Sequence, residues 1–142
     1  LGPQDNPAVV DRLRGYRAVL GEGLPDANVI YTGWISGDGY QAMHQILARE
    51  IAFDGVLCGS DRIAAGVITA LNETGLSVPA DVSVVGFDDH EIAARCVPAL
   101  TTVRQPLREE GHMAANIALD MIKGAEPTTS VMHMQLIQRD SL

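Results

Sequence analysis

Residues 55–89, GVLCGSDRIAAGVITALNETGLSVPADVSVVGFDD, contain the most informative pattern for the architecture of this chain. The apolar runs Gly55–Cys58 and Val82–Gly86 are typical of buried strands, and between them Asp61–Thr74 places its apolar residues on one helical face. Gly75 follows this helix and can adopt the positive φ that ends many helices. A strand, a helix and a strand joined by short connections predict a right-handed βαβ unit with parallel strands.

The same alternation of helical and strand-like segments extends outward in both directions. The helical pattern predicts helices at Asp11–Leu20, ending near Gly21 and Gly23, at Gly39–Glu50 and at Arg108–Lys123. Short apolar runs predict further strands at Asn28–Thr32, Leu100–Val103 and Val131–Ile137. Strands that are apolar along their whole length indicate a sheet covered on both faces. We therefore expect an α/β fold, with a parallel sheet and helices on both of its faces.

Composition limits the class of protein. The chain has 142 residues, of which 46% are hydrophobic and 20% charged, as expected for one domain with a substantial core. No apolar run reaches about 18 residues, so we expect no membrane association. Cys58 and Cys96 are expected to be reduced thiols, and no Cys/His spacing is typical of a metal site. We expect neither a metal nor a cofactor.

Charge bears on the question of nucleic-acid binding. The formal net charge is -8, and the 10 Lys and Arg residues are scattered along the sequence. Binding to DNA requires a basic patch that displaces counterions from the phosphates. We therefore expect no contact between this segment and DNA.

The predicted sheet also indicates where a ligand would bind. In open parallel sheets, ligands bind outside the carboxyl ends of the strands. We expect Trp34, Ser60 and Asp88 to converge there on a single hollow. These residues belong to the segments that follow predicted strands, namely Gly33–Ser36, Gly59–Asp61 and Phe87–His90.

Several motifs occur in a fixed order along the chain. They are Arg12-x-x-Gly15-Tyr16, Ser60–Gly66 (SDRIAAG), Val78–Asp89 (VPADVSVVGFDD), Pro98–Pro106 (PALTTVRQP) and Leu136–Ser141 (LIQRDS). In combination they resemble the lac/gal repressor family of bacterial transcription regulators, over essentially the whole chain from Arg12 onward. The resemblance implies a lobe like that of the periplasmic binding proteins of type I. It also implies that the helix-turn-helix, the hinge helix and most of a first lobe lie outside this sequence.

The resemblance divides the chain into three parts. Residues 1–98 correspond to the C-terminal lobe of the effector-binding domain, incomplete at its start. Residues 99–127 correspond to a strand and a helix of the N-terminal lobe, and residues 128–142 to a final strand that returns to the C-terminal lobe. The helix Arg108–Lys123 has an apolar face that this segment cannot cover, so we expect it to pack against the missing lobe or another partner.

Asp88 is the first candidate for ligand binding. Its carboxylate can accept hydrogen bonds from vicinal hydroxyls of a sugar or pair with a cationic nitrogen. From position alone, it could equally be the N-cap of a following helix. The resemblance assigns Asp88 to the ligand and suggests a structural role for Asp89.

The other candidates also depend on the resemblance. It assigns Arg12 and Trp34 to the effector, although Arg12 could be a solvated helix residue and Trp34 could pack at a strand end. Ser60 is a candidate for the pocket and for the N-cap of its helix, and Asp61 for a contact that supports the pocket. Ser60 stands where many family members have Asn, which leaves the identity of the effector open. Gln105 resembles a residue near the effector, or is a polar strand end.

The resemblance implies a function without catalytic residues. A sugar or a nucleoside-like effector closes two lobes in a cytoplasmic homodimer, and closure changes how the absent helix-turn-helix binds operator DNA. One alternative is a periplasmic sugar-binding protein of a transport system. A second is an enzyme that holds Mg²⁺ on Asp88 and Asp89. The second is disfavoured because Lys123 is the single lysine and no GxSxG or phosphate-binding glycine loop is present.

Overall fold

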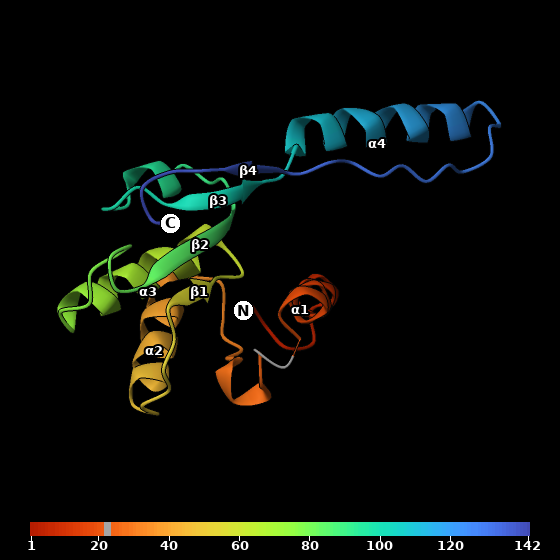
Figure 1. The fold of residues 1–142 in the computed structure, drawn as a ribbon. Coiled ribbons are helices and arrows are strands. Elements are labelled where there is room, and N and C mark those ends of the chain that lie inside the picture. Colours follow the sequence, from red (N-terminus) through yellow and green to blue (C-terminus); the bar gives the residue numbers. More distant parts are fainter. Residues whose placement is uncertain (22–23) are drawn as a thin grey trace.

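The computed structural model describes residues 1–21 and 24–142, and a single sheet organises this part of the chain. The strands β1 to β3 are parallel, and β4 is antiparallel to β3. Together with the surrounding helices (Figure 1), the sheet confirms the expected α/β fold. The strands, in their order across the sheet, are β1 (Gly55–Leu57), β2 (Ser83–Asp88), β3 (Thr101–Arg104) and β4 (Gln135–Ile137).

The α-helices lie close to the predicted positions. They are α1 (Pro7–Leu20), α2 (Ser36–Leu47), α3 (Asp61–Glu73) and α4 (Leu107–Ile122). Two short 3-10 helices, η2 (Asp26–Asn28) and η3 (Ala93–Arg95), were not predicted. Figure 1 shows α2 and α3 on one side of β1 and β2, and α1 on the other. Gly75 follows α3 with a φ of 83°, as predicted. The predicted end of α1 near Gly23 lies outside the described residues.

The core lies between α2, α3 and the sheet. Two glycines let the helices approach closely: a Cβ at Gly39 would lie 2.1 Å from the Ile63 carbonyl oxygen, and one at Gly66 would lie 1.9 Å from that of Ser36. Met43, Leu71, Val84 and Leu100 are fully buried, and they belong to the cluster of apolar side chains that fills the space beneath the sheet. This packing holds α3 against α2 and β2.

Two of the strand predictions were wrong in extent or kind. Asn28–Thr32 is not a strand: it ends η2 and continues as extended chain. Leu1 lies beside this chain, with hydrogen bonds from Leu1 N to the Ile30 carbonyl (2.8 Å) and from Thr32 N to the Leu1 carbonyl (3.1 Å). The third parallel strand is β3 instead. Val131–Ile137 is a strand only from Gln135 onward, because its earlier residues have no partner on β3. An apolar run therefore became a strand only where a neighbouring strand was available.

The helix α4 stands apart from the rest of the described chain. Figure 1 shows it extending away from the sheet, joined to it through β3 on one side and the approach to β4 on the other. None of its residues is buried, and Leu119 and Ile122 are 53% and 81% exposed. Among the described residues, no helix combines the length and apolar character needed to span a membrane.

Candidate effector-binding site

The carboxyl ends of the three parallel strands meet at one edge of the sheet. Leu57 is paired with Val85, and Asp88 is paired with Arg104, so the residues that follow β1, β2 and β3 lie near one another. The sequence places Ser60, Asp88 and Gln105 just at these ends. This is the edge at which we expected a ligand to bind from the sequence.

Arg12 reaches this edge from α1. Its Nη1 donates a hydrogen bond to the Gly59 carbonyl at 2.9 Å, and its guanidinium carbon lies 3.7 Å from the centre of the Phe87 ring. Gly59 precedes Ser60 and Phe87 precedes Asp88, so one side chain spans two of the predicted segments. The alternative of a solvated helix residue is therefore wrong for Arg12.

Asp88 and Gln105 are in direct contact. The Gln105 amide Nε2 donates to Asp88 Oδ1 at 2.5 Å, and Asp88 has a φ of 108°. The N-cap alternative for Asp88 is wrong, because the next helical turn, η3, begins only at Ala93 and has no side-chain cap. Within the described part of the chain, Gln105 is the one side chain that donates a hydrogen bond to Asp88, and it does so at Oδ1 and not at Oδ2.

The contacts of Ser60 and Trp34 relate them to this edge through other residues. Ser60 is 6% exposed, and its Oγ accepts a hydrogen bond from Ile63 N at 3.3 Å, which makes it the N-cap of α3. Trp34 is 37% exposed, and its ring lies against Gly2, which in turn adjoins Gly59. The structure brings Arg12, Ser60, Asp88 and Gln105 to one edge of the sheet. Trp34 adjoins this edge through Gly2.

A cavity of about 430 Å³ lies at a different place, between α1, α2 and β1. Its walls include Leu13, Tyr16, Met43, Val56 and Leu57, and none of the five residues predicted to bind a ligand lines it. The expected hollow shared by Trp34, Ser60 and Asp88 therefore does not coincide with this cavity. Among the described residues, His, Cys, Asp and Glu form no group of three or more able to hold a metal ion.

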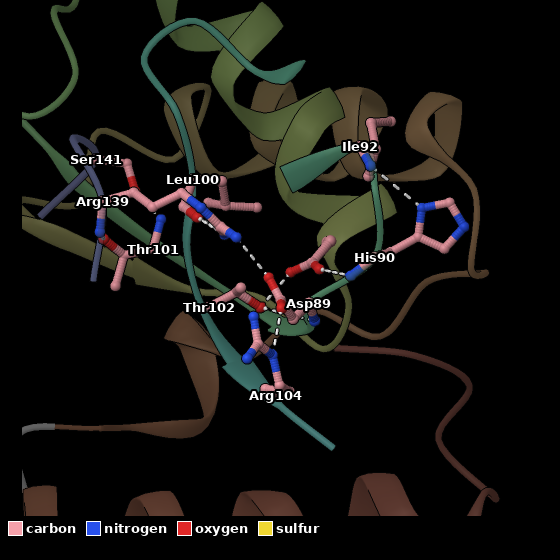
Figure 2. Close-up of polar contacts among 10 residues, drawn as sticks. Asp89, His90, Ile92, Leu100, Thr101, Thr102, Arg104, Arg139 and Ser141 are labelled. Carbon is pink, nitrogen blue, oxygen red and sulfur yellow. Dashed lines mark hydrogen bonds and ion pairs between the residues drawn. The ribbon is translucent and has the colours of Figure 1, made fainter. Parts of the chain in front are cut away.

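Asp89 holds two segments that are distant in sequence. Its Oδ1 accepts from Arg139 Nη2 and its Oδ2 from Arg104 Nε, both at 2.6 Å (Figure 2). Burial opposes ionisation, but the hydrogen bonds and charges of Arg139 and Arg104 hold the pKa of Asp89 below its ordinary value. This arrangement agrees with the structural role expected for Asp89.

Asp61 lies fully buried beneath the same loop. Its Oδ1 accepts from Thr102 Oγ1 at 2.5 Å and its Oδ2 from His90 N at 2.7 Å (Figure 2). Burial raises the pKa of Asp61, although the two hydrogen bonds oppose this effect. Sequence reasoning missed Thr102, Arg104 and Arg139, although all three lie in the motifs LTTVRQ and LIQRDS. For Thr102 the available signal was a polar residue inside a predicted buried strand.

Comparison with known proteins agrees with this geometry. The family model for the periplasmic binding protein-like domain matches residues 1–142. The HTH-type transcriptional repressor PurR of Escherichia fergusonii is 38% identical over 146 residues, which cover 99% of this chain and 43% of that protein. The solved complex of the transcriptional regulator CelR with cellobiose has a TM-score of 0.92 and 35% identity, covering 99% of this chain and 44% of CelR.

A sugar-binding transcriptional regulator of the LacI family from Escherichia coli, solved with phosphate, has a TM-score of 0.90 and 33% identity. The match covers 99% of this chain and 52% of that one. This chain belongs to the periplasmic binding protein-like domain family. The resemblance to lac/gal repressors is confirmed, since these relatives are transcription regulators of that type. The chain spans less than half the length of the PurR relative.

Proposed function

We propose that this chain is the effector-sensing part of a bacterial DNA-binding transcription regulator and not an enzyme. The observation that carries the proposal is the meeting of Arg12, Asp88 and Gln105 at the ends of β1, β2 and β3. It is supported by relatives that are repressors or regulators, which favours this function over that of a periplasmic transport protein.

The chemistry of the edge favours a polyhydroxylated effector. The second oxygen of Asp88 is an acceptor and the remaining N–H groups of Arg12 are donors, and vicinal hydroxyls can pair with both kinds of group. The half-exposed Trp34 offers an aromatic face for a sugar or base ring. CelR is solved with cellobiose and the Escherichia coli regulator is named as sugar-binding, which supports a sugar first and a nucleoside-like compound second.

We place the division between lobes after β3. The sequence suggested a boundary at residue 98, but Thr101–Arg104 pairs with β2 in the described sheet. The chain then leaves at Gln105, forms α4 and returns at β4. We propose that α4 packs against a lobe encoded elsewhere in the natural protein, because its exposed apolar side chains disfavour isolation in water.

Effector binding would act by closing the two lobes. A ligand shifts such an equilibrium only as far as it binds the closed state better than the open one. In this proposal the regulator is a cytoplasmic homodimer that contacts operator DNA through an N-terminal domain outside this chain. The net charge of -8 supports the absence of DNA contacts from these residues.

The enzyme alternative is disfavoured by the contacts of Asp89. Its two oxygens are held by Arg104 and Arg139, so Asp88 and Asp89 do not form a free pair of carboxylates for Mg²⁺. No described feature favours another catalytic chemistry.

The test is a thermal-shift screen of the full natural protein with cellobiose, other sugars, nucleosides and purines. A compound that binds the native state raises the melting temperature. Asp88→Asn is expected to abolish the shift, and Trp34→Phe to remove a fluorescence change on binding. Arg14→Ala is the control and should leave the shift unchanged, because Arg14 is exposed on α1 and does not belong to the proposed site. Binding that survives Asp88→Asn at full strength would contradict the site, and a panel without any binder would contradict the proposed effector chemistry.

A further inference from the structure

We infer that Thr102 and Asp61 are positioning residues that fix the direction of Asp88 toward the effector. This inference deepens the proposed function and rests on it for the role of Asp88. It adds a specific hydrogen-bonded support to the site, built from residues that do not themselves face the ligand.

The loop that bears Asp88 has an unusual backbone. Asp88 and Asp89 have φ values of 108° and 54°, in a region that residues other than glycine rarely adopt. Such a conformation persists only where surrounding contacts enforce it. The direction of the Asp88 side chain depends on this backbone, so whatever holds the loop also sets the binding geometry.

Two amide groups directly after Asp88 are held by one hydrogen-bonded pair. Asp89 N donates to Thr102 Oγ1 at 3.3 Å, and His90 N donates to Asp61 Oδ2 at 2.7 Å. The Thr102 hydroxyl gives its single hydrogen to Asp61 Oδ1 at 2.5 Å. Its oxygen is thereby oriented as an acceptor for the Asp89 amide. The pair therefore holds the loop at two consecutive residues, Asp89 and His90.

The position of Asp61 at the start of α3 does not explain why an aspartate is buried there, because Asp61 is not the residue that caps this helix. The capping hydrogen bond is made by Ser60, whose Oγ accepts from Ile63 N. Asp61 is instead fully buried, where an ionised carboxylate is costly unless both oxygens are bonded. The sheet makes room for it, since a Cβ on Gly86 would lie 2.2 Å from Asp61 Oδ1. Both oxygens point to the β2 loop and β3, which is the arrangement a positioning role requires.

The side chain of Asp89 provides the second anchor. Arg104 from the end of β3 and Arg139 from the segment after β4 hold its two oxygens. The backbone amides of Asp89 and His90 and the side chain of Asp89, which directly follow Asp88, are thus all held by hydrogen bonds. Asp88 meets Gln105 from a loop with little freedom to turn away.

The test compares Thr102→Val, which removes the hydroxyl at nearly constant shape, with Thr102→Ser, which retains it. Ser141→Ala is the control: Ser141 is buried, and its Oγ accepts from Thr101 N and donates to the Val84 carbonyl, without contact to the loop. Amide hydrogen exchange of Asp89 and His90 is measured in the full natural protein without ligand, and cellobiose and the rest of the panel are then titrated.

Thr102→Val removes both hydrogen bonds of the hydroxyl, so we expect exchange at Asp89 and His90 to speed by about tenfold or more. The dissociation constant of any bound panel compound should rise by a similar factor. Thr102→Ser should restore both, and Ser141→Ala should leave both unchanged while lowering the melting temperature. Unchanged exchange in Thr102→Val, or equal losses in Ser141→Ala, would overturn the inference. If no panel compound binds wild type, the proposed function fails, while the exchange data still decide whether Thr102 holds the loop.

Discussion

Replacing Arg12 with Ala should loosen the attachment of α1 to the strand ends, even without an effector. Arg12 contributes one hydrogen bond to the Gly59 carbonyl and one cation–π contact with Phe87. A hydrogen bond from a charged donor contributes about 1.5–3 kcal/mol, and a cation–π contact about 0.5–2 kcal/mol. Because Arg12 is partly exposed, we take the lower ends and expect a loss of about 2 kcal/mol.

The assay is thermal unfolding of the full natural protein in the absence of ligand. A loss of about 2 kcal/mol corresponds to about 4–8 °C in melting temperature for a domain of ordinary size. Arg12→Lys should recover only part of this, because an ammonium lacks the planar fork that stacks on Phe87. Arg14→Ala should change the melting temperature little, since its ion pair with Asp11 is exposed at 76% and 70%. If Arg12→Ala were as mild as Arg14→Ala, the bridge between the strand ends would not exist in solution.

Three further outcomes follow from the same structure. The pKa of Asp89 is lower in the folded protein than in the unfolded chain, so its ionised carboxylate stabilises the fold. This contribution is fully present above the ordinary aspartate pKa and is lost as the pH falls through the lower pKa of the folded protein. Thermal unfolding against pH should therefore show an acid limb that Asp89→Asn flattens. Gly66→Ala should lower the free energy of unfolding by at least about 2 kcal/mol, because the added Cβ would clash with the Ser36 carbonyl oxygen. Gly15→Ala is the control, since a Cβ at this exposed glycine meets no other atom, and chemical denaturation measures the stability of both variants. Burial raises the pKa of Cys58 to about 12, so iodoacetamide should label it only after unfolding, as mass spectrometry would reveal.

The helices were predictable because their signals are local. Apolar spacing, Ser60 before the helix and Gly75 after it placed α3 within one residue of its observed bounds. The start of α1 was predicted too late, although Asn6 and Pro7 are a cap and a first-turn residue of a common kind, and Asn6 accepts from Ala8 N. The missed signal was thus present in the sequence.

The strand predictions failed where pairing decided the outcome. An apolar run such as Asn28–Thr32 has strand propensity, but propensity without a hydrogen-bonded neighbour does not make a ladder. The opposite case is β3, whose Thr101 and Thr102 are fully buried polar residues. Their hydroxyls bond to Arg139 N and to Asp61, both of which are distant in the sequence.

Local patterns were enough to predict the class of fold, the positions of the α-helices and the motifs that place this chain among repressor-like binding domains. Those features depend on residues near one another in the chain. Three contacts could be seen only in the folded chain: Arg12 spans Gly59 and Phe87, Gln105 meets Asp88, and Thr102 and Asp61 hold the loop after β2. Hydrogen bonds between residues dozens of positions apart depend on strand register and helix packing, and these are set by the whole core rather than by any local pattern.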